Sequence, residues 1–298
     1  MTLDRSAYSA LIEARVHEPE SLRAALMRRS RRPLVGDDGR LLIVAADHTA
    51  RGMLAASGDP LAVADRFTLL DRLTSALAVP GVDGVLASAD ILEELAWLGA
   101  LDDRLAIGTM NRGGIIGATW ELDDRMTAFD ADHVAALGLD GGKTLLRIDH
   151  TDPGVARTIE HVAATVTALA DRRIMAMVEP LPYRKDDTGR AVLDPSDEAL
   201  IKVIAIASGL GSSSAYTWLK VPGSDRMHEV AGATSLPILM LGGDPGADAE
   251  RTFGRWARAM EEPNVRGLVA GRSLLYPQDR PTREAVEHAA AIVHGGAA

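Results

Sequence analysis

Short apolar runs recur along the chain, and amphipathic segments separate them. Gly, Pro or Asp bounds each run, and the segments that follow carry apolar residues at helical spacing. The eight runs are 41–46, 84–88, 105–109, 144–148, 174–179, 217–221, 237–241 and 267–271. Because continuous apolar strands that alternate with helices are typical of parallel sheets covered by helices, the runs predict parallel strands.

Eight strand–helix units predict an α/β fold, a single (β/α)8 TIM barrel. Helical patterns are clearest in the segments 60–77, 154–172, 196–210 and 247–262. We expect a helical N-terminal extension within 1–38 and the barrel within 39–298, together forming one domain, 1–298. An open doubly wound sheet is the alternative, which is disfavoured because no G-x-G-x-x-G motif follows the first run.

Composition narrows the function without naming it. With 47% hydrophobic and 25% charged residues over 298 positions, the chain resembles a globular protein with a large core. The net charge of −10 disfavours nucleic-acid and membrane partners but does not exclude a small anionic ligand. The absence of cysteine excludes disulfides and a thiol nucleophile. Since no signal pattern or membrane-length apolar run is present, we expect a cytoplasmic protein. Separately, we expect a homo-oligomer.

Lysine is rare in this chain, and one lysine interrupts a predicted strand. Of the 32 Lys and Arg residues, only four are lysines. They are Lys143, Lys185, Lys202 and Lys220. In the run 217–221, alternation puts Lys220 on the face of Trp218 and away from Leu219, so Lys220 should point into the barrel.

An amine inside a barrel can do chemistry that a guanidinium cannot. Burial lowers the pKa of a lysine, so a neutral nucleophile becomes available near pH 7, whereas arginine does not deprotonate in proteins. The alternative is that Lys220 pairs with a buried carboxylate or extends to the barrel mouth. The sequence leaves both interpretations open, and the rarity of lysine favours the first.

Two carboxylates end predicted strands on the side of a barrel where active sites lie. Glu179 ends the run 174–179 on a face shared with two methionines. It is a candidate general acid or base, and an ion pair with Lys220 or Arg147 is an equally good interpretation. Asp47 follows the first run and is either functional or a cap for the following turn.

Other polar residues near the strand ends carry weaker signals. Lys143 precedes the run 144–148, and its spacing does not decide between the inside and the bottom of the barrel. His48 and His150 lack the spacing of paired metal ligands, so we interpret them as loop histidines.

Glycines end the last two predicted strands. Gly242 and Gly243 follow the run 237–241, and Gly271 ends the final run, directly before Arg272. Glycine allows the backbone to approach phosphate oxygens closely, and an arginine can add a bidentate contact. Two glycine-bearing ends on adjacent late strands favour a phosphate site over simple tight turns.

Six stretches together resemble the class I, Schiff-base aldolases of (β/α)8 fold. They are AADHTARG, KTLLRID, VEPLPY, WLKVP, LGGD and GLVAGRSLLYP, in this order. The similarity is closest to tagatose-1,6-bisphosphate aldolase and to relatives acting on fructose bisphosphate, sulfofructose phosphate and deoxyribose phosphate, and it covers about residues 41–277. It implies a lyase that needs no cofactor or metal, cleaves or forms a C–C bond of a phosphorylated ketose-type substrate, and releases dihydroxyacetone phosphate.

The resemblance also implies roles for individual residues. Lys220 would form the Schiff base, and Glu179 would transfer protons. Lys143 and Asp47 would complete the catalytic set. The substrate phosphate would be bound by Gly242, Gly243, Gly271 and Arg272.

Three stretches depart from the family pattern. They are RIDH with Arg147, TMNRGG with Arg112, and 183–197, which reads as a long loop. A substrate with a carboxylate would suit a second cation, either Arg147 or Arg112. One such substrate is 2-deoxy-5-keto-gluconate 6-phosphate of inositol breakdown, which would yield dihydroxyacetone phosphate and malonate semialdehyde.

Two other functions stay open at this point. The first is a metal-dependent lyase or isomerase on the same barrel. Its ligands would be Asp47, His48, Asp149, His150 and Glu179. The second is a barrel that binds a small phosphorylated sugar or keto acid without catalysis.

Overall fold

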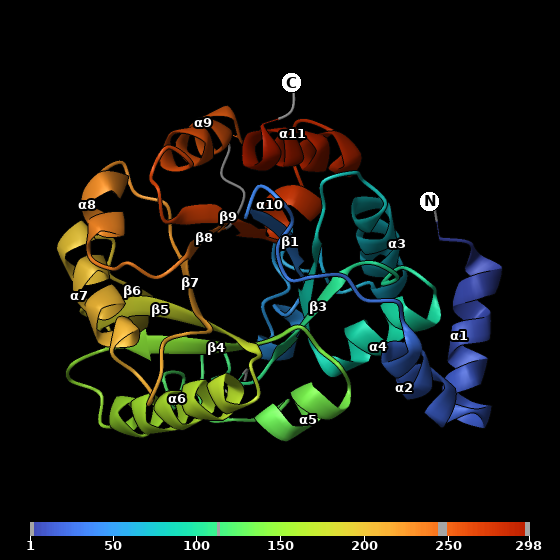
Figure 1. Ribbon diagram of the computed structural model, residues 1–298, viewed down its shortest axis with the longest axis horizontal. Helices are drawn as coiled ribbons and strands as arrows, with labels where there is room; N and C mark the ends of the chain where they lie inside the picture. The colour runs from blue at the N-terminus through green and yellow to red at the C-terminus, as the bar shows by residue number, and fades with distance from the viewer. Residues whose placement is uncertain (1–2, 112–113, 244–248, 296–298) are drawn as a thin grey trace.

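The computed structural model describes residues 3–111, 114–243 and 249–295, and within them eight parallel strands close into a barrel (Figure 1). The strands pair in the order β1-β2-β3-β4-β5-β7-β8-β9, and β9 returns to β1. Their bounds are Leu41–Ala45 (β1), Gly84–Ala87 (β2), Leu105–Thr109 (β3), Gly141–Ile148 (β4), Met175–Lys185 (β5), Thr217–Val221 (β7), Ile238–Leu241 (β8) and Val265–Ala270 (β9). The predicted TIM barrel is confirmed, and each apolar run overlaps one strand, although β4, β5 and β9 extend beyond their runs.

Helices surround the barrel, and those in the predicted amphipathic segments are present (Figure 1). The outer helices are Arg66–Leu77 (α3), Ala89–Trp97 (α4), Ala131–Ala136 (α5), Gly154–Asp171 (α6), Asp197–Ser208 (α7), Met227–Gly232 (α8), Ala249–Ala259 (α9) and Thr282–His294 (α11). Two short helices follow strands β1 and β9, namely Thr49–Arg51 (η1) and Arg272–Leu275 (α10). Within the described ranges, no helix combines the length and the apolar character needed to span a membrane.

The N-terminal extension forms two helices, Arg5–His17 (α1) and Pro19–Arg28 (α2), which lie outside the ring (Figure 1). Asp4 caps α1 by accepting a hydrogen bond from the backbone of Ser6. The apolar side of α2 packs against α4 and buries Leu22 and Leu26. The extension therefore packs on the outside of the barrel.

Alternation along the strands divides the core into two layers. The interior of the barrel holds a cluster of large apolar side chains that includes Met175, Met177 and the partly buried Trp218. The layer between strands and helices holds Leu219 and Val221. Successive residues of a strand point to opposite faces, so Lys220 shares the interior face with Trp218, as the pattern predicted.

Residues 183–197 do not form the long loop that the sequence suggested. Strand β5 continues to Lys185 and pairs antiparallel with the short strand β6, Ala191–Leu193. Asp186 closes the turn by accepting hydrogen bonds from the backbone of Thr188 and Arg190, and Gly189 takes a φ of +79°. The prediction was wrong because a three-residue strand is too short to produce a visible alternation.

The last helix is tied to the bottom of the barrel by His294. Its Nδ1 lies 2.6 Å from Asp38 Oδ2, and its Nε2 lies 3.3 Å from Asp83 Oδ2. The hydrogen bond with Asp83 raises the pKa of His294 to about 9, so the imidazole is charged at neutral pH. This cation joins the end of α11 to the segments that precede β1 and β2.

Candidate active site

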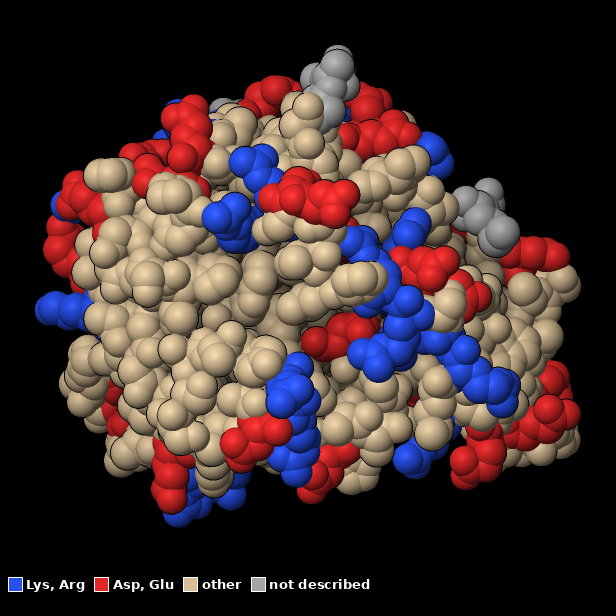
Figure 2. Space-filling model, in the orientation of Figure 1, with Lys and Arg blue, Asp and Glu red and all other residues tan. Residues whose placement is uncertain are grey.

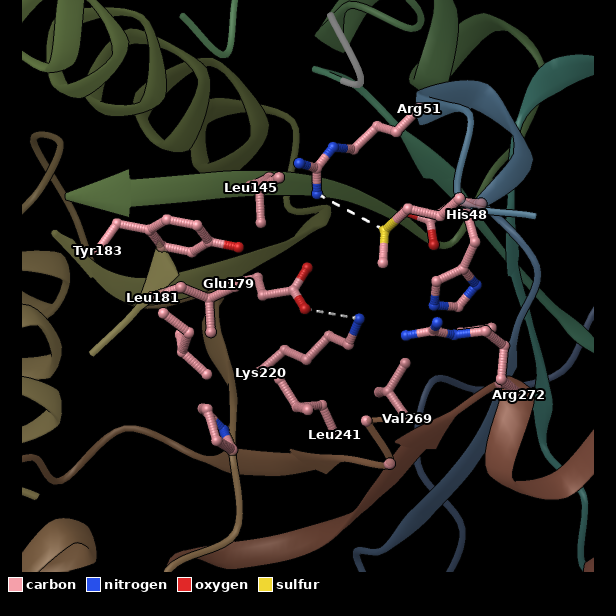
Figure 3. Close-up of a pocket in the computed structure, with 18 residues that line it drawn as sticks. His48, Arg51, Leu145, Glu179, Leu181, Tyr183, Lys220, Leu241, Val269 and Arg272 are labelled. Atoms are coloured by element: carbon pink, nitrogen blue, oxygen red, sulfur yellow. Dashed lines mark hydrogen bonds and ion pairs between the residues drawn. The ribbon is translucent and has the colours of Figure 1, made fainter. Parts of the chain in front are cut away.

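A pocket of about 170 Å³ opens at the carboxyl ends of the strands (Figure 3). Its lining comes from the ends of β1, β5, β7, β8 and β9 and the segments that follow them, together with Leu145 of β4 and Leu193 at the end of β6. Over the face shown in Figure 2, acidic and basic side chains are mixed, so no single sign of charge dominates that face. The chemistry of the pocket therefore depends on its own side chains.

Four buried ionisable side chains alternate in charge at one end of this pocket. Lys220 Nζ lies 2.9 Å from Glu179 Oε1 (Figure 3). Lys143 forms an ion pair with the other oxygen of Glu179. Lys143 Nζ also lies 3.3 Å from Asp47 Oδ2. The exposed fraction is 0% for Lys143, 1% for Asp47, 4% for Lys220 and 6% for Glu179. The structure thus brings together the whole set that the sequence proposed as catalytic.

Strand register explains how residues so distant in sequence meet. Lys143 is the third residue of β4, level with Thr109 of β3 and Met177 of β5, so it lies inside the barrel and not at its bottom. Glu179 follows Met177 on the same face of β5. Since Val178 pairs with Leu219, the next residues along the two strands, Glu179 and Lys220, are level with each other.

The two lysines differ in their access to the pocket. Lys220 and Glu179 line it, whereas Lys143 lies behind the lining with its ammonium matched by Glu179 and Asp47. Asp47 also accepts a hydrogen bond of 3.3 Å from the hydroxyl of Thr109. Lys220 is therefore the amine that a bound molecule can reach, and Lys143 is placed to hold the carboxylates.

The glycines that end β8 and β9 face the same pocket. Gly242, Gly243, Gly271 and Arg272 all line it. A Cβ on Gly271 would lie 2.3 Å from the backbone oxygen of Ala45, so no side chain fits there. Gly243 has a φ of +67°, which favours glycine. Asp244, which follows them in the sequence, lies outside the described residues.

Arg147 is not part of the pocket lining, in contrast to the expectation that it would contact the substrate. Its side chain is fully buried, with Nε and Nη2 lying 2.8 and 2.7 Å from the two oxygens of Asp124. Burial alone would lower the pKa of Arg147, but the hydrogen bonds to Asp124 raise it. Nη1 also lies 3.2 Å from Glu121, so Arg147 holds the segment that follows β3 over the barrel. Arg112 lies outside the described residues.

Two residues line the pocket that were not among the proposed site residues. Arg51 ends η1, four residues after Asp47, and is 4% exposed. Tyr183 follows Glu179 and Leu181 on the inner face of β5 and turns its hydroxyl toward the pocket (Figure 3). The available signal was position alone, since both follow strands on the functional side of the barrel.

The histidines occupy different surroundings. His48 lines the pocket, and Figure 3 shows its ring beside Arg272. His150 is exposed in the turn after β4. Among the residues that the structure describes, no three His, Cys, Asp or Glu side chains gather in a way that could hold a metal ion.

Comparisons with known proteins agree with this fold. The model of the Cgl0159-like family matches residues 39–290. Cgl0159 from Corynebacterium glutamicum is 44% identical, with a TM-score of 0.95 over 98% of both chains. The chain belongs to the Cgl0159-like family.

More distant structures share only the fold. An archaeal fructose-1,6-bisphosphate aldolase is 20% identical, with a TM-score of 0.67 over 92% of this chain and 100% of its own. Fructose-bisphosphate aldolase from Slackia heliotrinireducens is 12% identical, with a TM-score of 0.65 over 99% of this chain and 89% of its own. None of the curated proteins compared with this chain matches it.

Proposed function

We propose that this member of the Cgl0159-like family is a class I aldolase that forms a Schiff base through Lys220. One observation carries the proposal: the lysine that lines the pocket lies 2.9 Å from Glu179, which a second, fully buried lysine also contacts. The archaeal aldolase of the same fold holds its substrate as a carbinolamine on its catalytic lysine. The same chemistry would suit Lys220.

The first steps form the covalent bond. Glu179 takes a proton from the Lys220 ammonium, and the neutral amine adds to the substrate ketone. A second proton moves from nitrogen to oxygen within the adduct, which gives a carbinolamine. Glu179 then returns its proton to the departing hydroxyl, which leaves as water and creates an iminium. The 2.9 Å contact permits the first of these transfers, from the ammonium to Glu179, without a relay.

The iminium then allows cleavage. The hydroxyl β to the iminium carbon loses its proton to Glu179, which is ionised again at this stage. The C–C bond breaks, its electron pair flows to the iminium nitrogen, and an aldehyde and an enamine form. The proton returns to the enamine carbon, and water hydrolyses the new iminium to release dihydroxyacetone phosphate and the Lys220 amine.

Lys143 and Asp47 support this cycle through charge. Lys143 contacts Glu179 and Asp47 together, and it stabilises whichever carboxylate is ionised. Gly242, Gly243, Gly271 and Arg272 would bind the substrate phosphate and bring the ketone to Lys220. The substrate that we propose is 2-deoxy-5-keto-gluconate 6-phosphate, whose cleavage yields dihydroxyacetone phosphate and malonate semialdehyde.

Borohydride trapping tests the proposal. Incubation with dihydroxyacetone phosphate and borohydride should add one reduced adduct to the peptide that carries Lys220. Because the chain has only four lysines, peptide mapping assigns the site without ambiguity. Lys220→Arg keeps a cation beside Glu179 but cannot form an imine, so it should give no adduct. Lys202→Arg, which changes an exposed lysine, should label like the wild type.

Two results would reject this function. One is that Lys220 stays unmodified after borohydride reduction in the presence of every ketose phosphate tested. The other is a carbon–carbon cleavage activity that a chelator abolishes, which would favour a metal-dependent lyase.

A further inference from the structure

A buried arginine enters the pocket from the side of Leu145. In the sequence it lies far from the glycines that we propose bind phosphate. Figure 3 shows the Arg51 guanidinium directed into the pocket near Leu145 and Tyr183, whereas Arg272 enters beside His48. Arg51 is 4% exposed, and it comes from η1, directly after β1. Among the described residues, two guanidinium groups therefore approach the pocket from different elements.

The segment after β3 fixes the orientation of Arg51. Its Nε donates a hydrogen bond of 2.8 Å to the backbone oxygen of Gly114. Its Nη2 lies 3.7 Å from Glu121 Oε1, an oxygen that also lies 3.2 Å from Arg147 Nη1. Arg147 in turn is held by the fully buried Asp124. A chain of ion pairs therefore places the guanidinium before any ligand binds.

This orientation presents the terminal nitrogens of Arg51 to the pocket. The Nε side is turned to Gly114, and Nη1 lies 3.9 Å from the sulfur of Met53, itself a lining residue. An anion that reaches Arg51 from the pocket would meet Nη1 and Nη2 together. Parallel contacts of this kind suit the two oxygens of a planar carboxylate.

The local charge also favours a singly charged ligand group. Glu121 lies between Arg51 and Arg147, so it offsets part of the charge of Arg51. A monoanionic carboxylate needs one compensating cation, whereas a phosphate dianion needs more. The glycines with Arg272 are better suited to phosphate, since backbone N–H groups can add to the guanidinium there.

We propose that Arg51 is the specificity-determining residue for the aldehyde half of the substrate, and that this half is a short aldehyde ending in a carboxylate. The inference rests on the aldolase function proposed above. It assigns the two ends of the substrate to two arginines, with the phosphate at Arg272 and the carboxylate at Arg51. Lys220 lines the pocket between these groups in Figure 3 and forms the imine with the ketone.

Synthesis from dihydroxyacetone phosphate tests this assignment. The acceptors are glyoxylate, malonate semialdehyde and succinic semialdehyde, matched to acetaldehyde, propanal and butanal, with glyceraldehyde 3-phosphate as the phosphorylated arm. The wild type should prefer a carboxylated acceptor over its neutral match by about 10²-fold in kcat/KM, the value of a charge-assisted bidentate contact. Arg51→Gln should remove most of this preference, and it should change kcat/KM for the neutral acceptors by less than about 3-fold.

Controls separate recognition from folding. Arg125→Gln changes an exposed arginine of the same segment, paired with Asp123, and should behave like the wild type. Arg51→Gln should still form the adduct with dihydroxyacetone phosphate on Lys220, because that step does not need the aldehyde. A wild-type protein that gives no adduct at all would reject the proposed function itself.

Two outcomes would overturn the assignment while the aldolase function stands. Arg51→Gln could lower kcat/KM by the same factor for carboxylated and neutral acceptors, which would make Arg51 a structural support of the segment after β3. Alternatively, the wild type could prefer glyceraldehyde 3-phosphate over every carboxylated acceptor, which would make the second group a phosphate.

Discussion

Replacement of Lys143 by Met gives the sharpest test of the ion pairs among the four buried ionisable side chains of the pocket. Lys143 is 0% exposed and contacts both Glu179 and Asp47. Met has a similar length, so the substitution removes a charge and leaves little cavity. Two buried carboxylates then have only Lys220 as a cationic partner among the four groups. Removal of one partner of a buried ion pair costs about 3–5 kcal/mol, so the free energy of unfolding should fall by that amount.

A second substitution tests whether this cost is electrostatic. Asp47→Asn in the Lys143→Met background removes the carboxylate that has lost its contact with Lys143, and it leaves Glu179 paired with Lys220. The double variant should therefore be more stable than the sum of the single effects predicts, by about 1–3 kcal/mol. Unfolding in urea at constant pH, followed by circular dichroism, measures all four proteins of this cycle.

The control and the refuting result are both clear. Lys202→Met changes an exposed lysine and should alter stability by less than about 0.5 kcal/mol. The reasoning fails if Lys143→Met lies within about 1 kcal/mol of the wild type, or if the two single effects simply add. In either case Lys143 would not hold the carboxylates by charge.

Three further predictions concern the rest of the molecule. His294, whose pKa the hydrogen bond with Asp83 raises to about 9, contributes stability that is complete below its unfolded pKa of 6.5 and is lost as pH rises through 9. The difference in unfolding free energy between the wild type and His294→Gln, measured in urea, should therefore shrink by about 1–2 kcal/mol between pH 6.5 and 9, with allowance for solvent screening. Gly271→Ala should slow adduct formation at least about 10-fold and cost about 1–3 kcal/mol in thermal unfolding, since its Cβ would overlap a backbone oxygen at 2.3 Å. Arg147→Met should cost about 3–5 kcal/mol because Asp124 stays buried, and Asp124→Asn in that background should recover part of it in the same assay.

Local pattern was sufficient for the barrel. A continuous apolar run predicted each strand, because a strand inside a barrel is buried on both faces. Each predicted amphipathic segment contains a helix, because a helix that covers the barrel is buried on one face and shows the helical period. The same alternation put Lys220 inside, since Trp218 and Leu219 belong to different layers. Once the barrel was inferred, the ends of its strands identified the candidate residues.

Contacts between distant segments were beyond the reach of pattern. The hairpin at Tyr183–Leu193 depends on a strand of three residues, which is too short to show a period. Arg147 and Lys143 both lie in β4 and both are fully buried, yet one holds a surface segment and the other joins the site. Arg51 enters the pocket because its Nε meets the backbone of Gly114, 63 residues away.

The sequence by itself thus determined the architecture and the inward direction of Lys220, because both follow from the spacing of neighbouring residues. Only the tertiary structure decided which charges meet. Glu179 contacts two lysines because closure of the barrel brings β4 and β7 to either side of β5. Ion pairs depend on distances of a few ångströms between segments far apart in the chain, and no local pattern encodes those distances.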